Sequence, residues 1–466
     1  MSVNLEDDIA AIATAPGEAG LAVVRVSGPG AIALADRVFH GAAPLAEAAG
    51  HTLHHGWAAS PGVRDRLLDE VVAAVFRAPR SFTREDVVEL SCHGGALPAR
   101  QVLDALLAAG ARLAGPGEFT LRAFLHGRLD LAQAEAVADL IHAETRAASD
   151  LALSQLRGAL SERLHAFADR VGDCVAEVEA RVDFAEDVGG VEVPPHVIAA
   201  ARALAADLAA FVGAGAWARA VREGVHVPIV GRPNAGKSTL FNRLLGEERA
   251  IVSATPGTTR DRVSEALELG GVRVTLSDTA GLRGTADEVE AEGVERTRHA
   301  IEASALVVWV HDAARIADAE DARIAASLAG RRVVLALNKC DAPLADPARA
   351  AASLASLPGA AGAPALALSA RTGEGLGALA DRLARELGAG EGGSLAGAVA
   401  NARHAEALLR AVAALDRAAA AGEAGAPGEI VALELRESLG AIEEVTGRRV
   451  SDELLDRIFG RFCIGK

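Results

Sequence analysis

The sequence predicts a multidomain protein of mixed α/β and α class. Its 466 residues exceed what one compact core usually holds and suggest about three domains of roughly 150 residues each. A glycine-rich phosphate-binding pattern lies mid-chain, between a strand pattern and a helical pattern. Long stretches on both sides of it have helical periodicity, and the alanine-rich composition, with only 3% aromatic residues, favours helix.

The first 122 residues are expected to form an α+β domain of their own. Three short apolar strands and one helix are predicted, over 20–28, 69–79, 85–95 and 99–112. His51, His54 and His55 raise the alternative of a metal site in this domain. No carboxylate or thiol is spaced to join them, so a loop or strand edge is the favoured interpretation.

Helical segments flank the nucleotide-binding region on both sides. Residues 123–220 carry one continuous apolar stripe with steps of three and four, which is typical of an amphipathic helix. The stripe consists of Leu153, Leu156, Leu160, Leu164, Phe167, Val171, Cys174, Val178 and Val182, and it places Cys174 in the core. Residues 386–466 are predicted to be helical over 402–420 and 430–447, after a glycine-rich return linker over 387–397. We therefore expect a helical bundle divided in sequence by an inserted α/β domain at 221–385.

The inserted domain begins with a P-loop. The apolar strand Val225–Val230 runs into Gly231-x-x-x-x-Gly236-Lys237-Ser238, and a helical pattern follows. Glycines let backbone N–H groups turn toward phosphate oxygens, and the helix N-terminus adds partial positive charge. Lys237 is expected to reach the β- and γ-phosphates, and the Ser238 hydroxyl to ligate Mg²⁺.

Two later motifs predict that the base is guanine. A buried strand leads into Asn338-Lys339-Cys340-Asp341, in which Cys340 is expected only to pack. The Asp341 carboxylate can accept hydrogen bonds from the ring N–H and the amino group of guanine. Adenine offers no such pair and would leave the carboxylate unsatisfied. The backbone of Ser369-Ala370 can donate to the guanine carbonyl, which completes the pattern of a GTPase.

The region expected to contact the γ-phosphate differs at one position from that of Ras-type GTPases. A strand ends in Asp278-x-x-Gly281, which places a carboxylate near the Mg²⁺ shell and a backbone N–H near the γ-phosphate. Thr259, in a predicted switch segment over 251–261, is the expected second hydroxyl ligand of Mg²⁺, with a threonine-rich turn as the alternative. Leu282 stands where Ras-type enzymes have a water-orienting glutamine, so hydrolysis is expected to use a catalytic group from elsewhere.

Composition and the chain ends argue against several classes of protein. The net charge of −16 argues against non-specific coating of nucleic acid, although the basic stretch 447–466 fits either anion binding or a solvated helix face. Four scattered cysteines disfavour disulfides and zinc. With no apolar run of 18 residues and an acidic start, a cytoplasmic protein without a membrane span is expected. Cys463 has the spacing of a prenylation box, but Gly465 and Lys466 do not fit one.

Seven stretches of sequence carry a family resemblance. They are "AIATAPGEAGLAVVRVSG", "SFTREDVVELSCHGG", "GPGEFTLRAFLHGRLDLAQAEAVADLI", "GRPNAGKS", "PGTTRD", "DTAGLR" and the terminal "FCIGK". On these motifs the chain resembles the MnmE (TrmE) family of tRNA-modification GTPases over essentially its whole length. The resemblance implies a folate-binding and dimerisation domain (1–122), a helical domain in two parts (123–220 and 386–466), and an inserted Ras-like GTPase domain (221–385).

The resemblance also implies a reaction and its partners. The family hydrolyses GTP in a homodimer and, with the flavoprotein MnmG, which carries FAD, adds a (carboxymethyl)aminomethyl-type group to C5 of the wobble uridine of certain tRNAs. A tetrahydrofolate derivative supplies the one-carbon unit. The implied folate contacts are Arg25, Glu89, Arg128 and Lys466. The chain departs from the family at Arg84, where glycine is common, a difference that bears on the local turn and leaves the pocket in place.

Further site residues follow from the same resemblance. The implied K⁺ ligands are Asn234, Ser253, Thr255 and Thr258, and Glu290 is implied to position the attacking water. Cys463 is a candidate nucleophile or acid/base beside the folate pocket, with simple packing of the tail as the alternative. The implied GTP contacts are Asn234, Ala235, Gly236, Lys237, Ser238, Thr239, Ser253, Ala254, Thr255, Pro256, Gly257, Thr258, Thr259, Asp278, Thr279, Ala280, Gly281, Asn338, Lys339, Asp341, Ser369, Ala370 and Arg371.

A function of another class fits the P-loop equally well. Many P-loop GTPases are GTP-dependent switches or assembly factors that bind RNA without modifying it. The folate-type pattern of the N-terminal region and the FCIGK tail distinguish the two hypotheses, because a simple switch needs neither.

Overall fold

The fold confirms the multidomain α/β and α class. The computed structural model describes residues 4–62, 66–183, 192–247, 264–278, 301, 304–388 and 395–466. The chain forms two compact units. Unit 1 comprises Met1–Ala138, Gln155–Gly172 and Leu439–Lys466, and unit 2 comprises Asp139–Ser154 and Asp173–Ser438. The division into four segments expected from the sequence stays a prediction.

Unit 1 contains a seven-stranded sheet in the order β3-β4-β5-β6-β2-β1-β7, antiparallel except for the pair β1–β7. Period-2 alternation puts Val24, Leu90 and their neighbours into a core with the helices α1 and α2. The elements are β1 (Ile9–Ile12), β2 (Leu21–Ser27), α1 (Ala31–Asp36), β3 (Phe39–Gly41), the 3₁₀ helix η1 (Leu45–Glu47), β4 (Thr52–Ala59), β5 (Leu67–Phe76), β6 (Val87–His93), α2 (Ala96–Ala108) and β7 (Arg112–Leu113).

The three histidines of this unit have different partners. His51 lies edge-on to Phe76 with 5.5 Å between ring centroids, and His54 is 2.8 Å from the Thr52 hydroxyl. The Nε2 atom of His55 lies 2.7 Å from a carboxylate oxygen of Glu70. Among the described residues no group of three or more His, Cys, Asp or Glu side chains that could hold a metal ion occurs.

A second core of unit 1 joins the segment after the sheet to the C-terminal tail. The ring centroids of Phe459 and Phe462 lie 5.4 Å apart, and both rings pack with Leu121 and Leu131. Arg122 is fully buried, and its guanidinium bonds three carboxylates, those of Asp7, Glu85 and Glu118. The helices are α3 (Glu118–Leu125), α4 (Leu131–His142), which continues into unit 2, and α16 (Asp452–Phe459).

Unit 2 contains a six-stranded sheet in the order β13-β12-β11-β8-β10-β9, in which only β9 is antiparallel. The strand predicted over Val225–Val230 is observed with those bounds as β8, at an interior position where its last four residues are buried on both faces. The other elements are α9 (Lys237–Glu247), β9 (Ser264–Leu269), β10 (Val272–Asp278), β11 (Val307–Asp312), α11 (Ala319–Ser327), β12 (Val333–Asn338), α12 (Pro347–Ala355), β13 (Ala365–Ala367) and α13 (Leu376–Glu386).

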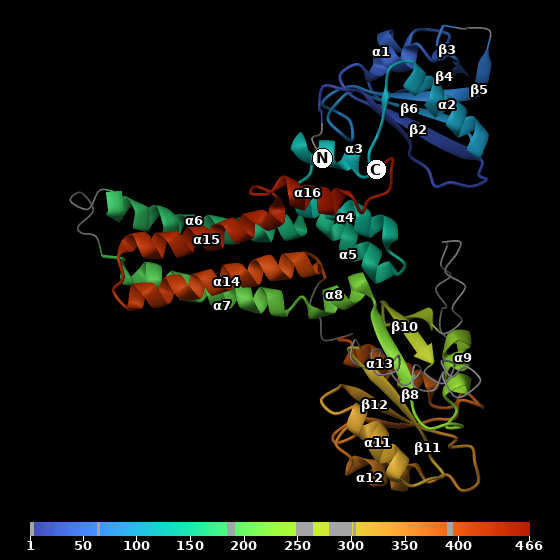
Figure 1. Cartoon of the computed structure of the whole chain (residues 1–466), viewed down its shortest axis with the longest axis vertical. Coiled ribbons are helices and arrows are strands. Elements are labelled where there is room, and N and C mark those ends of the chain that lie inside the picture. Colours follow the sequence, from blue (N-terminus) through green and yellow to red (C-terminus); the bar gives the residue numbers. More distant parts are fainter. Residues whose placement is uncertain are drawn as a thin grey trace, which may run out of the picture. The chain divides into compact units, whose positions relative to one another are not determined.

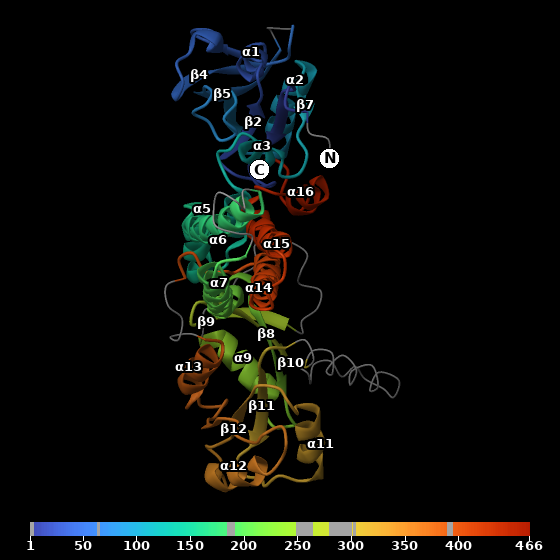
Figure 2. The same ribbon diagram turned by 90° about the vertical axis from the view of Figure 1, so that its left-hand side faces the viewer.

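Helices α7 (Pro195–Gly213) and α14 (Ala402–Glu423) lie side by side, although the whole six-stranded sheet separates them in sequence. Figures 1 and 2 show this pair from two directions. Arg202 on α7 bonds Glu423 on α14 at 2.9 Å. Beyond α7, Arg219 in α8 (Ala216–Glu223) donates to the carbonyl of Val399 at 3.4 Å. The two ends of the inserted sheet domain are therefore in contact, as an insertion into a helical bundle requires.

The predicted continuous stripe over 153–182 is wrong in one respect. It is divided into α5 (Arg146–Leu156) and α6 (Ala159–Asp183), because Gly158 has a φ of +91° and ends the helical path. Leu153 is exposed, whereas Leu160, Leu164 and Val171 are buried as expected. Cys174 is buried too, which confirms its place in the core.

The corner between α4 and α5 contacts the β9–β10 turn within unit 2. Thr145 donates its hydroxyl to the Gly271 carbonyl at 2.9 Å, and Glu144 pairs with Arg273 at 2.5 Å. Asp139 accepts two hydrogen bonds from Arg222, at 2.7 and 2.9 Å. These contacts attach a helical segment to the end of the sheet where β8 and β10 begin. The nucleotide motifs follow the opposite ends of the strands.

The stretch Pro195–Glu223 is long and apolar enough by composition to cross a membrane, a test that core helices of soluble proteins also pass. It contains Arg202 and Asp207, so it is not an uninterrupted apolar run. In the structure it forms α7 and α8, and Leu204 and Leu208 of α7 are buried in the protein core. The remaining helix, α15 (Gly428–Thr446), is amphipathic, and its Arg436 pairs with Glu179 of α6 at 2.5 Å.

Candidate functional site

The P-loop lies between β8 and α9, as the motif predicts. Gly231 and Gly236 have φ values of +145° and +97°, which L side chains rarely adopt. A Cβ on Gly231 would lie 2.2 Å from the Val310 carbonyl, so glycine is required here for close packing against β11. The buried Lys237 donates its amino group to the carbonyls of Gly231 and Arg232, at 2.9 and 2.7 Å, and thereby closes the loop on itself.

Asn338, at the end of β12, connects the base-recognition segments to the P-loop. Its side-chain amide donates to the Ala235 carbonyl at 2.9 Å, and its side-chain oxygen accepts from the Ala370 N–H at 2.9 Å. A Cβ on Gly236 would lie 2.2 Å from the Asn338 amide nitrogen. Three predicted segments, around residues 235, 338 and 370, thus meet at one buried amide.

The Asp341 carboxylate is held in its ionised form, in which it can accept hydrogen bonds. The Ser369 hydroxyl donates to its carboxylate at 2.5 Å, and Arg371 forms an ion pair with it. These contacts, the hydroxyl first, hold the pKa of the Asp341 carboxyl below its ordinary value. A carboxylate that stays charged can accept the two N–H donors of guanine, so the arrangement supports the predicted base preference.

Three ion pairs beside the nucleotide motifs escaped the sequence analysis. Lys339, whose φ is +65°, pairs with Asp312 at the end of β11 at 2.8 Å. Arg232, inside the P-loop, pairs with Asp318 and, at 2.8 Å, with Glu320 at the start of α11. None of these three acids belongs to a motif. The sequence analysis predicted neither the strand that ends at Asp312 nor the helix at whose start Asp318 and Glu320 lie.

The Mg²⁺ and K⁺ predictions are only partly covered by the described residues. Ser238 and Thr239 are exposed in the first turn of α9, and Asn234 is exposed with a φ of +63°. Asp278 ends β10, the strand next to and parallel with β8. These oxygen-bearing side chains suit a hard cation such as Mg²⁺. The remaining predicted residues lie outside the described part of the chain: Ser253, Ala254, Thr255, Pro256, Gly257, Thr258, Thr259, Thr279, Ala280, Gly281, Leu282 and Glu290.

A second candidate site lies on the sheet of unit 1. Arg25 on β2 and Glu89 on β6 are direct cross-strand partners, and their side chains form an ion pair at 2.6 Å. The Arg25 guanidinium also lies over the rings of Phe82 and Phe119, 5.4 and 5.5 Å from the centroids. Arg128, after α3, lies over Phe82 as well, at 4.8 Å. Two of the four predicted folate contacts, Arg25 and Arg128, therefore lie over one aromatic ring, and a third, Glu89, pairs with Arg25.

The tail brings the fourth contact toward the same sheet. Ile464 pairs with Pro116, and a Cβ on Gly465 would lie 2.3 Å from the Ile12 carbonyl at the end of β1. Lys466 therefore follows a segment that packs beside β1, the neighbour of β2. The side chain of Cys463 is exposed, and the adjacent Phe462 packs the tail in its place.

Comparisons with known proteins identify the family of the chain. A family model described as "MnmE helical domain" matches residues 131–463, and one described as "GTP-binding protein TrmE N-terminus" matches residues 8–128. A protein named "tRNA modification GTPase MnmE" from Symbiobacterium thermophilum is 46% identical over 464 residues, which is 99% of this chain and 100% of that protein. The chain belongs to the MnmE family of tRNA modification GTPases. The protein of that name from Moorella thermoacetica is 45% identical, with 99% and 100% covered.

Membership in the MnmE family establishes the coarse activity. The chain is a GTP-hydrolysing enzyme involved in tRNA modification. Solved structures similar to the chain include Era of Aquifex aeolicus bound to GDP·AlF4⁻, with 25% identity, 41% of this chain and 66% of that chain covered, and a TM-score of 0.29. The G domain of T. maritima FeoB gives 25% identity, 35% and 98% coverage and a TM-score of 0.26. Scores this low add nothing to the family assignment.

Proposed function

We propose that this enzyme is a K⁺-stimulated GTPase that works with a flavoprotein partner on the wobble uridine of certain tRNAs. The added group is of the (carboxymethyl)aminomethyl type at C5, and a one-carbon tetrahydrofolate derivative is the carbon donor. The observation that carries the proposal is the cluster of Arg25, Glu89 and Arg128 around Phe82. A simple GTP switch has no use for such a cluster.

The cluster has the chemistry that a folate requires. Folates combine a flat pterin ring, which stacks on aromatic and guanidinium planes, with carboxylates, which pair with arginine. Glu89 can accept hydrogen bonds from the pterin amino group, while Arg25 keeps that carboxylate oriented through their 2.6 Å contact. Arg128 and Lys466 supply positive charge for the carboxylates. When bound, the cofactor supplies the one-carbon unit, and these residues bind and orient it.

For GTP hydrolysis, we propose that a lysine and two cations hold positive charge around the phosphates. Lys237 and the P-loop N–H groups hold the β- and γ-phosphates, and Ser238 with Thr259 would hold Mg²⁺. A K⁺ ion bound by Asn234, Ser253, Thr255 and Thr258 would supply the positive charge that an arginine supplies in other GTPases. Glu290 would orient the attacking water, since Leu282 cannot.

A homodimer through unit 1 is part of the proposal. The sheet face away from α1 and α2 exposes Leu21, Leu53, Trp57 and Val72 on strands β2, β4 and β5. Exposed apolar residues gathered on one face of a sheet are typical of a protein interface. Pairing of two chains would also bring two nucleotide domains into one assembly, as K⁺-dependent hydrolysis between facing domains requires.

The experiment that tests the proposal is analysis of wobble nucleosides in cells that lack this protein, with and without complementation. We expect loss of the C5-modified uridine and its return with the wild-type chain. Complementation by Arg25→Ala should fail while its GTP turnover in vitro stays normal. Normal wobble nucleosides in the deletion strain would contradict the proposal and favour a GTP switch that performs no modification.

A further inference from the structure

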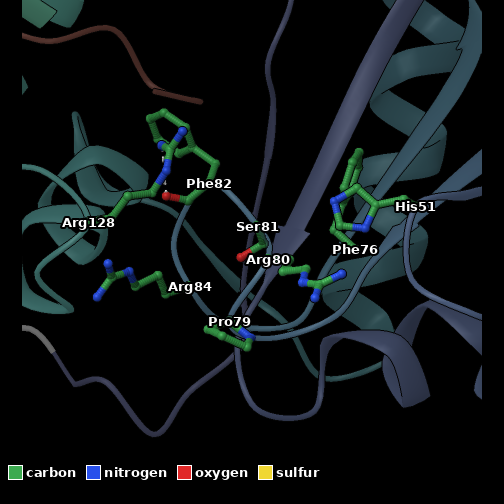
Figure 3. A pocket seen from close by; sticks show the side chains of 8 residues that line it. All are labelled: His51, Phe76, Pro79, Arg80, Ser81, Phe82, Arg84 and Arg128. Atoms are coloured by element: carbon green, nitrogen blue, oxygen red, sulfur yellow. Dashed lines mark hydrogen bonds between the residues drawn. The ribbon is translucent and has the colours of Figure 1, made fainter. Parts of the chain in front are cut away.

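Unit 1 has an open pocket of about 560 Å³, and Phe82 and Arg128 of the proposed folate cluster form part of its lining. A pocket of this size suits a small molecule or part of one. Figure 3 shows Phe82, Arg128 and Arg84 on one side, His51, Phe76 and Arg80 on the other, and Pro79 and Ser81 between them. Its lining residues are His51, Phe76, Pro79, Arg80, Ser81, Phe82, Arg84 and Arg128.

The pocket is strongly basic. Arg80, Arg84 and Arg128 are all exposed, and none of them forms an ion pair with a carboxylate in the described part of the chain. The nearest acids in sequence are already engaged. Glu85 is buried on Arg122, and Asp86 accepts from the Ala78 N–H at 2.8 Å. Three guanidiniums without an acid are unusual in a chain whose net charge is −16.

Two of the three guanidiniums, those of Arg84 and Arg128, are held in place by backbone carbonyls. Arg84 donates to the His126 carbonyl at 2.9 Å, and Arg128 donates to the Phe82 carbonyl at 3.1 Å. The His126 ring bonds the Thr83 carbonyl at 2.7 Å. Each guanidinium has five N–H donors, so one such bond orients it and leaves the others for a ligand. Burial and, after it, the charge of Arg84 lower the pKa of Arg128, which is the effect expected of two cations on one pocket.

Arg84 occupies its position against the preference of the backbone. Its φ is +63°, in the left-handed region that favours glycine and that costs an L residue about 1 kcal/mol. Arginine has none of the local hydrogen bonding by which asparagine or aspartate tolerate this region. The turn therefore does not explain why arginine occupies position 84, and the explanation lies in what its side chain does.

We propose that Arg80, Arg84 and Arg128 form a subsite for the carboxylates of a folate's γ-linked glutamate tail, so that this enzyme prefers polyglutamylated over monoglutamylated folate. The subsite rests on the proposed folate function and extends it. Phe82 is the common element, because Arg25 and Arg128 both lie over its ring. A ligand on that ring has the basic pocket directly beside it. Each added glutamate brings one carboxylate, and arginine binds carboxylates in a planar, two-bonded geometry.

The test is direct binding of a tetrahydrofolate derivative with one or with five glutamates to the full-length protein at low salt. We expect the pentaglutamate to bind about tenfold more tightly, which is what two or three partly exposed charge pairs provide. Arg84→Gly should remove most of that preference and leave monoglutamate binding unchanged. This variant also keeps the turn, because glycine favours the observed φ, so loss of folding is not expected. Arg84→Lys should retain part of the preference.

Arg100→Gln is the matched control, since Arg100 is exposed on α2 of the same unit and pairs only with Asp104. It should leave both affinities unchanged. Equal affinity of the wild-type protein for both folates would overturn the subsite while the folate function stands. Binding of neither folate would overturn the folate function and the subsite with it. If Arg84→Gly weakened binding of a tRNA and not of the pentaglutamate, the pocket would be a phosphate contact for RNA, contrary to the proposal.

Discussion

At the residue scale, Asn338 shows how far a motif predicts a site. The spacing of the motifs predicted that residues 235, 338 and 370 serve one nucleotide, and they do converge on the Asn338 amide. The motif did not predict the partners of Arg232 and Lys339, because those acids follow from how β11 and α11 pack. Contacts between two motif residues can be predicted, because both residues serve the same nucleotide. Contacts between a motif residue and a residue outside the motifs depend on how the chain packs, and the sequence does not show them.

Replacing Gly236 tests the convergence on Asn338. Gly236→Ala places a methyl group 2.2 Å from the Asn338 amide on a backbone with a φ of +97°. We expect GTP affinity to fall by about 10- to 100-fold, since strain and a lost hydrogen bond add. Titration with a fluorescent GTP analogue measures the loss. Gly246→Ala on α9, which meets no atom within 4 Å, is the control and should leave affinity unchanged. Wild-type affinity of Gly236→Ala would contradict the packing described here.

The four cysteines should differ in reactivity. Burial, followed by the charge of Asp69, raises the pKa of Cys92 to about 11, and Cys174 is also buried. At pH 8 these two thiols stay protonated or shielded, and only thiolates react readily with iodoacetamide. Cys463 is exposed and should be alkylated first in the native protein, and Cys463→Ser should abolish the fast phase. Mass spectrometry locates the label. Early labelling of Cys92 would contradict its buried position in the core of unit 1.

The role of Cys463 itself needs a separate measurement. If its thiol takes part in the modification reaction, Cys463→Ser should retain GTP turnover and lose tRNA modification. Phe462, not Cys463, packs the tail, so the substitution should leave the unfolding midpoint unchanged. Full modification by Cys463→Ser would rule out a chemical role for the thiol.

At the element scale, strands were predicted more accurately than helix ends. Buried parallel strands such as β8 and β12 are continuous apolar runs with clear limits, and both are observed where the sequence placed them. The stripe over 153–182 was misread, because apolar spacing continues in phase across the Arg157–Gly158 break. Periodicity reports which residues are buried, but it does not report whether one helix or two carry them.

The break at Gly158 makes a test with a matched control. Gly158→Ala forces alanine into a φ of +91° and should destabilise the protein by about 1 kcal/mol. Gly172→Ala lies within α6, where an added Cβ meets no atom within 4 Å. It should stabilise by about 0.5–1 kcal/mol, because alanine is the better helix former. Urea unfolding followed by circular dichroism measures both. Stabilisation by Gly158→Ala would mean that α5 and α6 are one helix.

At the scale of the whole molecule, α4 and the α4–α5 corner form one connection to α8 and the β9–β10 turn, which is a candidate for coupling GTP hydrolysis to the rest of the enzyme. It joins a helical segment to the sheet without touching the P-loop. The sequence could not predict it, because Asp139 and Arg222 lie 83 positions apart and neither belongs to a motif.

Removing the Arg222 side chain should separate GTP binding from the coupling of hydrolysis to tRNA modification. Arg222→Gln should leave GTP affinity unchanged and reduce tRNA modification by about fivefold, toward the lower end of typical coupling energies. The control is Arg331→Gln, an exposed arginine of the same unit with no ion pair among the described residues. Both variants are assayed for nucleotide binding and for wobble modification. Equal losses of binding and modification in Arg222→Gln would show that the contact only supports folding.

The contact between Arg219 and Val399 has a consequence for how this enzyme can be taken apart. Beside it, the backbone at Gly215 lies against the Val399 carbonyl, where an added Cβ would be 2.3 Å away, so a few residues would suffice to reconnect these two points after excision of everything between. We therefore expect the nucleotide-hydrolysing segment to be exchangeable for that of a related GTPase, with cuts at Gly215 and Val399 that fall between α7 and α8 and before α14.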